Sequence, residues 1–147
     1  MNEAAPAVDF TDDRLIRRLV TLVDYLGLDR RDFVIFGSGP LLAHNLRTRV
    51  SDLDIVARGA AWRCVSLHGM TGRGTHNNAP MAVFWGGLIQ FSQGWISPDW
   101  DADDLIDRAE TIQGLPFAQL TDVLRYKEAL DRRKDRHDIQ ILRPLLS

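Results

Sequence analysis

Cysteine is nearly absent from this sequence: Cys64 is the one example among 147 residues. A single cysteine excludes an internal disulfide framework, and no second cysteine stands at the C-x-x-C spacing of a zinc site. The four histidines also lack the spacing of zinc ligands; they are His44, His68, His76 and His137. We therefore expect no zinc module, and the composition suits the reducing cytoplasm.

Long apolar runs are absent as well. The N-terminal segment has neither the basic stretch nor the apolar core of a secretory signal. Residues 74 to 98 contain no Asp, Glu, Lys or Arg, but polar residues interrupt them. No run approaches the roughly 18 apolar residues of a spanning helix, so we interpret this region as buried strands and expect no membrane partner.

Neither sign of charge is in excess: 18 Lys and Arg residues against 20 Asp and Glu give a formal net charge of -2. This balance argues against a broad positively charged surface for binding nucleic acid, but it is compatible with a local basic patch. The chain is 45% hydrophobic and 26% charged, as folded globular domains are. Its length predicts a single domain, which we place over residues 11–147. We expect residues 1–10 to form a flexible arm.

The pattern of apolar residues predicts a mixture of helices and strands. Helical spacing from Thr11, as N-cap, to Leu26 ends at Gly27, and a hairpin signal surrounds Gly86 and Gly87. We expect further helices over 41–46, 60–67, 101–109, 121–130 and 135–142, strands over 33–36, 51–56, 81–85 and 88–92, an extended segment over 115–117, and a loop over 70–79. This order predicts an α+β domain with a small mixed sheet and flanking helices.

Two acidic residues, Asp52 and Asp54, stand two positions apart on a predicted strand. This spacing projects them to one side, while Leu53 and Ile55 face the core. Adjacent carboxylates repel one another and are costly to bury unless a cation compensates them. Oxygen ligands favour Mg²⁺ or Mn²⁺. The alternative is that both acids cap a turn or pair with Arg47, Arg49 or Arg58.

A Gly-Ser-Gly turn, Gly37 to Gly39, follows a predicted buried strand and precedes a predicted helix. Small residues there let a phosphate approach backbone N–H groups, and the helix N-terminus adds positive potential. Arg47 and Arg49 could neutralise such a phosphate. A tight turn without a ligand is the alternative, and the turn is not a Walker loop because the Gly-x4-Gly-Lys pattern is absent.

The segment FVIFGSGPLLAHNLRTRVSDLDIV, residues 33–56, resembles the signature of the DNA-polymerase-beta-like nucleotidyltransferase superfamily. Near the C-terminus, Lys127 and the run RKDRHDI resemble the Lys … Lys-Asp-x-x-Asp pattern of its small bacterial members. Those members include nucleotidyltransferases of abortive-infection toxin–antitoxin systems. The resemblance covers most of residues 30–142 and implies the minimal nucleotidyltransferase fold.

The resemblance also implies an activity: transfer of a nucleoside monophosphate from an NTP to a hydroxyl, with pyrophosphate leaving. Asp52 and Asp54 would be catalytic metal ligands for Mg²⁺ or Mn²⁺. The nucleotide would be bound by Gly37, Ser38, Arg47, Arg49 and Lys127. The acceptor stays open between a tRNA end, a protein hydroxyl and an antibiotic. A cognate toxin or antitoxin partner, or a second copy in a homodimer, could complete the site.

One position departs from this pattern. Active members of the superfamily carry a third carboxylate on a neighbouring strand, and the second arm of the predicted hairpin offers Gln90 there. An amide oxygen can ligate a metal weakly, but it carries no charge and accepts no proton as a base. Gln90 thus leaves open a catalytically inert relative that binds a nucleotide or a partner protein. Acids beyond the hairpin could substitute for the carboxylate, although their run is more typical of a solvated loop and helix start: Asp99, Asp101, Asp103 and Asp104.

The C-terminal segment concentrates basic residues, which we interpret as a solvated helix face with Lys127 as the exception. The alternative is a contact surface for a triphosphate or an RNA acceptor. The spacing of Asp135 and Asp138 predicts a helix N-cap with an acid at the third position. The basic residues are Arg125, Lys127, Arg132, Arg133, Lys134 and Arg136.

Overall fold

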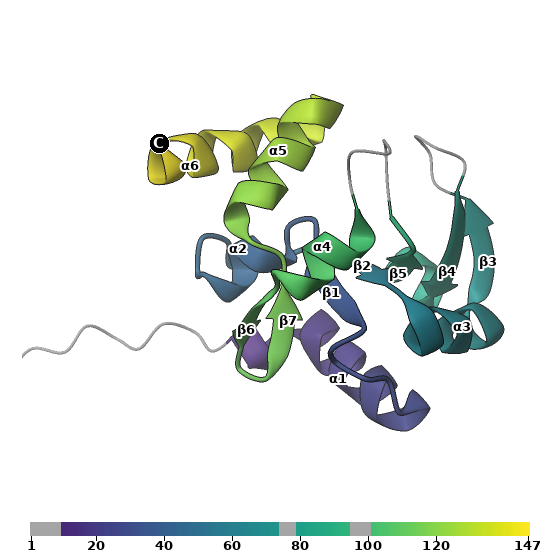
Figure 1. Cartoon of the computed structure of the whole chain (residues 1–147). Coiled ribbons are helices and arrows are strands. Elements are labelled where there is room, and N and C mark those ends of the chain that lie inside the picture. Colours follow the sequence, from purple (N-terminus) through teal and green to yellow (C-terminus); the bar gives the residue numbers. More distant parts are fainter. Residues whose placement is uncertain (1–9, 74–78, 95–100) are drawn as a thin grey trace, which may run out of the picture.

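The computed structural model describes residues 10–73, 79–94 and 101–147 (Figure 1). Strands and helices are interspersed along the described chain, with three short 3-10 turns. The strands are β1 (Phe33–Phe36), β2 (Leu53–Ala57), β3 (Met70–Arg73), β4 (Pro80–Phe84), β5 (Ile89–Ser92), β6 (Glu110–Ile112) and β7 (Leu115–Phe117). The helices are α1 (Arg14–Leu26), α2 (Gly39–Ala43), α3 (Gly59–His68), α4 (Ala102–Asp107), α5 (Leu120–Leu130) and α6 (Arg136–Leu146).

The strands form one seven-stranded sheet in the order β3-β4-β5-β2-β1-β7-β6. The pairs β2–β5 and β1–β7 are parallel, and the neighbours β1–β2, β3–β4, β4–β5 and β6–β7 are antiparallel. The predicted α+β class with a mixed sheet is therefore confirmed. The sheet is larger than predicted because β3 and β6 form its two edges.

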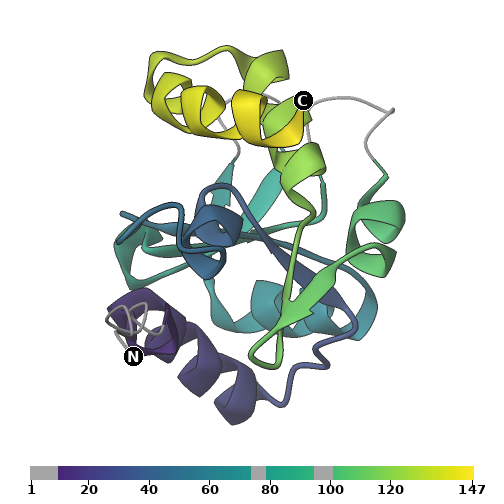
Figure 2. The same cartoon turned by 90° about the vertical axis from the view of Figure 1, so that its left-hand side faces the viewer.

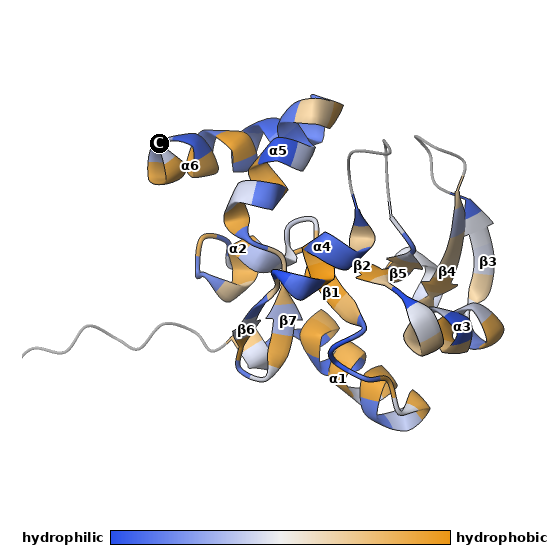
Figure 3. Cartoon of the chain, viewed as in Figure 1, coloured by the Kyte–Doolittle hydropathy of each residue, from blue (hydrophilic) through white to orange (hydrophobic). Residues whose placement is uncertain are grey.

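Each face of the sheet carries its own layer of helices. Along β1, Phe33 and Ile35 join a core cluster with α1 and α3, whereas Val34 and Phe36 join a second cluster with α4, α5 and α6. All four side chains are buried, as the apolar run predicts. Figure 2 shows α1 on one side of the sheet and α6 on the other. Figure 3 shows the apolar residues of β1 between these layers.

Helix α1 is bounded by two local signals. Asp13, not Thr11, is its N-cap: the Asp13 carboxylate accepts hydrogen bonds from the N–H groups of Leu15 and Ile16. Gly27 ends the helix with a φ of 68°, a conformation that costs glycine little. The predicted helix is thus confirmed, with its cap moved by two residues.

The predicted N-terminal arm differs from the structure at its last residue. Phe10 is buried and meets Phe117 edge to face, with ring centroids 5.5 Å apart. Residues 1–9 of that arm lie outside the described part of the chain, as do His76 in the predicted loop and Asp99 beyond the hairpin.

Several predicted boundaries are wrong. The predicted loop at Met70 begins with β3, whose mostly exposed side chains give no apolar signal because it is an edge strand. Helix α2 ends at Ala43 rather than near residue 46, and Asn45 follows with a φ of 60°. The hairpin loop has four residues, because Phe84 pairs with Ile89. Helix α6 continues through Pro144 in its last turn.

None of the helices in the described part of the chain has the length and apolar character that crossing a membrane requires.

Candidate functional site

Asp54 lies in the middle of the sheet. It is the second residue of β2, in register with Phe36 of β1 on one side and Gln90 of β5 on the other. Its strand neighbours Leu53 and Ile55 belong to the α1–α3 core cluster, so alternation directs Asp54 toward the face covered by α4, α5 and α6. Strand β2 begins at Leu53, which places Asp52 just before the strand rather than in it.

The carboxylate of Asp54 is in an unfavourable environment for its charge. Burial and the negative charge of Asp52 raise the pKa of Asp54 to about 6, while Lys134, Arg132 and Lys127 partly offset this rise. Both acids are half-buried. The negative charges of Asp52 and Asp54 therefore lie close together, and the nearby cations compensate them only partly.

Pairing of these acids with arginine, the alternative to metal binding, is not what the structure shows. Among the described residues, no side chain forms a hydrogen bond or ion pair with the carboxylate of Asp52 or Asp54. The guanidinium of Arg47 contacts Asp138 instead. That of Arg58 contacts Asp32, Asp103 and Asp107.

Gly37 brings the turn after β1 against Asp54. Its φ is 62°, in the left-handed region, and a Cβ at this position would lie 3.0 Å from Asp54 Oδ2. Both the backbone conformation and the lack of space require glycine. The Gly37–Ser38 turn and the Asp54 carboxylate are therefore direct neighbours, as a phosphate cradle facing a metal site requires.

The hydroxyl of Ser38 is fully engaged. Its Oγ donates a hydrogen bond to Asp138 Oδ2 (2.7 Å) and accepts hydrogen bonds from Arg47 Nη1 (3.1 Å) and Lys127 Nζ (3.3 Å). One donor and two acceptor lone pairs are all that a hydroxyl has. In this arrangement a phosphate held by the turn would have to be bound through backbone N–H groups.

Lys127 of α5 is the centre of a buried ionic cluster. Its Nζ lies 3.1 Å from Asp135 Oδ1 and 3.2 Å from Asp138 Oδ2, and all three side chains are at most 4% exposed. Arg132 reaches Asp135 as well, with Nε 2.6 Å from Oδ2. Burial alone would raise the pKa of Asp135, but the hydrogen bonds and charges of Arg132 and Lys127 outweigh it and lower that pKa.

The prediction that Asp135 is a helix N-cap with Asp138 in the first turn is confirmed in position, but the capping role is wrong. Asp135 is the N-cap residue of α6, but its side chain makes no capping hydrogen bond. A buried lysine needs counter-ions, and these two carboxylates supply them. The cluster connects the Gly37–Ser38 turn to the C-terminal motif. Ser38 and Asp138 are 100 residues apart in the sequence but are in direct contact.

Gln90 occupies the position that the hairpin predicts, next to Asp54 on β5. The Nε2 of Gln90 donates a hydrogen bond to the carbonyl oxygen of Gly87 at 3.1 Å. Its half-buried side chain thus brings a neutral amide to the strand where a third carboxylate would stand.

The site offers a metal two carboxylates. Across the described ranges, no group of three or more His, Cys, Asp or Glu side chains is placed to hold a metal ion. Mg²⁺ often binds through one or two carboxylates together with substrate phosphates, so Asp52 and Asp54 fit such an ion when a nucleotide supplies further oxygens. The incompletely compensated charge at Asp54 favours the same ligand.

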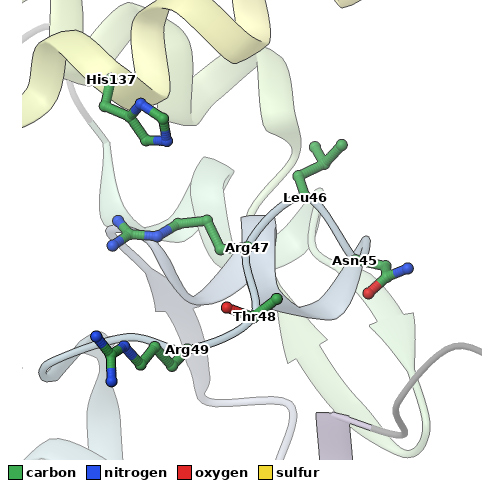
Figure 4. A pocket seen from close by; sticks show the side chains of 6 residues that line it. All are labelled: Asn45, Leu46, Arg47, Thr48, Arg49 and His137. Carbon is green, nitrogen blue, oxygen red and sulfur yellow. The ribbon is translucent and has the colours of Figure 1, made fainter.

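A pocket of about 320 Å³ lies beside this site (Figure 4). The segment after α2 and one residue of α6 line it: Asn45, Leu46, Arg47, Thr48, Arg49 and His137. Arg47 and Arg49, predicted to bind nucleotide, are thus brought together here, whereas Lys127 lies in the buried cluster.

Sequence reasoning missed several residues of this region. Arg132 and Lys134 are among the cations that act on Asp54, although the sequence favours a solvated surface for both. Tyr126 packs edge to face on Phe36 at 5.3 Å, and burial raises the pKa of Tyr126 to about 12. An apolar face at helical spacing in α5 was the available signal for Tyr126. His137 gives no comparable signal.

Comparison with known proteins finds similarity to a solved structure but to no family model and no curated sequence. A crystal structure from Thermotoga maritima, TM1012, provisionally assigned as a nucleotidyltransferase, superposes with a TM-score of 0.57 at 17% identity. The match covers 85% of this chain and 89% of that one. This likeness shows that the chain has a nucleotidyltransferase-like fold.

Proposed function

We propose that this protein is a cytoplasmic nucleotidyltransferase that uses Mg²⁺ or Mn²⁺ to transfer a nucleoside monophosphate from an NTP to a hydroxyl group. One observation carries the proposal. Two half-buried carboxylates without an ion-pair partner among the described residues stand beside a glycine turn, where a Cβ on Gly37 would lie 3.0 Å from Asp54 Oδ2. The nucleotidyltransferase-like fold supports the same assignment.

Asp52 and Asp54 would hold the metal ion through their carboxylate oxygens. The metal, when bound, would neutralise phosphate charge and lower the pKa of the attacking hydroxyl. The pKa of Asp54, about 6 without metal, keeps most of this group ionised at neutral pH and ready to bind a cation.

The residues around the carboxylates would orient the nucleotide. Gly37 lets the triphosphate approach the backbone, because a side chain there would fill the space beside Asp54. Lys134 and Arg132 extend positive charge toward Asp54 from the C-terminal segment. Lys127 would act as a positioning residue, since its ammonium group connects Ser38 to the two buried aspartates. In-line placement of the acceptor hydroxyl would supply much of the rate enhancement.

A second candidate function rests on Gln90. Its amide stands in register with Asp54 and cannot serve as a general base. A protein with this substitution could bind Mg²⁺ and an NTP without transferring the nucleotide, and act through a partner protein instead.

Transfer of radiolabel from α-labelled NTPs in the presence of Mg²⁺ and cell extract tests the proposal. We expect label in the RNA or protein fraction, and a loss of at least about 100-fold in Asp54→Asn, because the variant lacks a metal-binding charge. The control is Asp24→Asn, which changes an exposed aspartate of α1 on the opposite face of the sheet.

The alternatives give different results in the same assay. Absence of transfer with every NTP, together with Mg²⁺-dependent NTP binding in a calorimeter, would favour the inert binding protein. Transfer that Asp54→Asn leaves intact would contradict the assignment of this site.

A further inference from the structure

The pocket beside the Gly37–Ser38 turn contains Arg47, whose guanidinium group is hydrogen-bonded along one edge to Ser38 and to the buried Asp138. Arg47 Nη1 donates hydrogen bonds to Ser38 Oγ at 3.1 Å and to both oxygens of Asp138 at 3.3 Å. Asp138 is 1% exposed, so the anchor is rigid and buried. Nε and Nη2 of Arg47 make no hydrogen bond to any described residue, which leaves this edge of the guanidinium available.

Two more basic side chains line the same pocket. Arg49 and His137 are exposed, and neither forms an ion pair with a residue in the described ranges. Figure 4 shows Arg47 and Arg49 extending to the same side of their segment, with His137 of α6 beyond Arg47. The pocket therefore gathers donors and positive charge, although the chain as a whole has a net charge of -2.

This pocket is separate from the positive charge that serves the metal site. The cations acting on Asp54 are Lys134, Arg132 and Lys127, all from the C-terminal segment. Arg49 and His137 line the pocket instead. Arg47 also lines the pocket, and it contacts the Gly37–Ser38 turn through its hydrogen bond to Ser38. The positive charge of the pocket is therefore supplied by residues other than the cations acting on Asp54.

We propose that the pocket formed by residues 45–49 and His137 binds a phosphate group of a nucleic-acid acceptor strand, an inference that rests on the proposed transferase function. It assigns Arg49 to the acceptor and not, as the resemblance implies, to the NTP. Guanidinium groups present paired N–H donors that match phosphate oxygens. An acceptor bound in this pocket would place a neighbouring hydroxyl near the carboxylates, because Arg47 and the turn are in direct contact. Nucleic acid carries an anion at a regular distance from each terminal hydroxyl, which a protein side chain or a neutral small molecule does not.

The test compares binding of two probes to the full chain and to Arg49→Ala. A fluorescein-labelled single-stranded RNA is titrated by anisotropy between about 50 and 200 mM salt. Binding of a non-hydrolysable NTP with Mg²⁺ is measured by calorimetry. We expect Arg49→Ala to bind RNA about fivefold more weakly with a shallower salt dependence, and to bind the NTP as before.

The matched control is Arg63→Ala, which removes an exposed arginine of α3 that lies outside the pocket. It should leave both affinities unchanged. His137→Gln in the same assays gives a second measurement from the opposite wall and should weaken RNA binding alone.

Three results would overturn the proposal: weakening of NTP binding alone, weakening of both ligands to the same extent, or unchanged RNA binding. The first result would indicate that Arg49 binds the triphosphate of the NTP. Failure of the transferase assay is a separate result, because RNA binding through Arg49 and His137 can be present or absent whether or not label is transferred.

Discussion

Two pairs of aspartates near the Gly37–Ser38 turn have opposite environments. Asp135 and Asp138 are almost completely buried, and Lys127 lies within 3.2 Å of both. Asp52 and Asp54 are half-buried, and no described cation forms an ion pair with either carboxylate. The pKa of Asp135 is lowered, whereas burial and Asp52 raise that of Asp54 to about 6.

This difference separates a structural pair from one available to a ligand. The first pair is satisfied by the chain itself and connects α5 and α6 to the Gly37–Ser38 turn. The second pair has a charge that the fold compensates only partly, so a cation from outside would relieve it. The comparison predicts that removing charge has opposite consequences at the two places.

The largest effect should follow removal of the shared cation. Lys127→Met leaves two buried carboxylates without their lysine, so we expect a loss of about 3–5 kcal/mol in the free energy of unfolding at pH 7. Urea denaturation followed by circular dichroism measures it. Lys134→Met, which removes an exposed lysine nearby, should change stability by less than about 0.5 kcal/mol. Equal effects of the two variants would contradict the buried cluster.

Neutralising one aspartate of each pair should shift stability in opposite directions. At pH 7 without divalent cations, Asp135→Asn should destabilise the protein by about 2 kcal/mol, because the ionised form is the one that the fold favours. Asp54→Asn should stabilise it by about 1–3 kcal/mol, because the fold disfavours the ionised form.

The pH dependence of these two variants follows from the same pKa shifts. The penalty at Asp54 is complete above pH 6 and disappears as pH falls toward 3.8, its ordinary pKa, so the advantage of Asp54→Asn should vanish there. The contribution of Asp135, with a lowered pKa, is complete above about pH 4 and is lost only at lower pH. Parallel unfolding curves from about pH 2 to pH 8 measure both. A destabilising Asp54→Asn at pH 7 would show that its charge is already compensated.

The smallest effect concerns the amide beside Asp54. Gln90→Glu adds a third negative charge next to the carboxylates, so we expect Mg²⁺ to bind about tenfold more tightly, a change of about 1.4 kcal/mol. The measurement is the Mg²⁺ concentration that raises the thermal midpoint without nucleotide. Gln113→Glu, in the exposed turn between β6 and β7, is the control. An unchanged Mg²⁺ response would mean that Gln90 does not face the metal.

Local sequence patterns predicted much of the fold. The apolar run of β1, the helical spacing of α1 with Gly27, and the two glycines of the hairpin all led to elements that the structure contains. Edge strands β3 and β6 were not predicted, because half-exposed strands of three or four residues carry no clear apolar period.

The sequence by itself determined the central strands and the residues of the candidate site, because an apolar run, a two-residue spacing of acids and a glycine before a helix are local signals. Tertiary structure alone decided which charges meet. Ser38 contacts Asp138 across 100 residues, and the aspartates that resembled a helix cap became the counter-ions of Lys127. Ion pairs depend on distance in space, and only the packing of α5 and α6 over the sheet sets that distance.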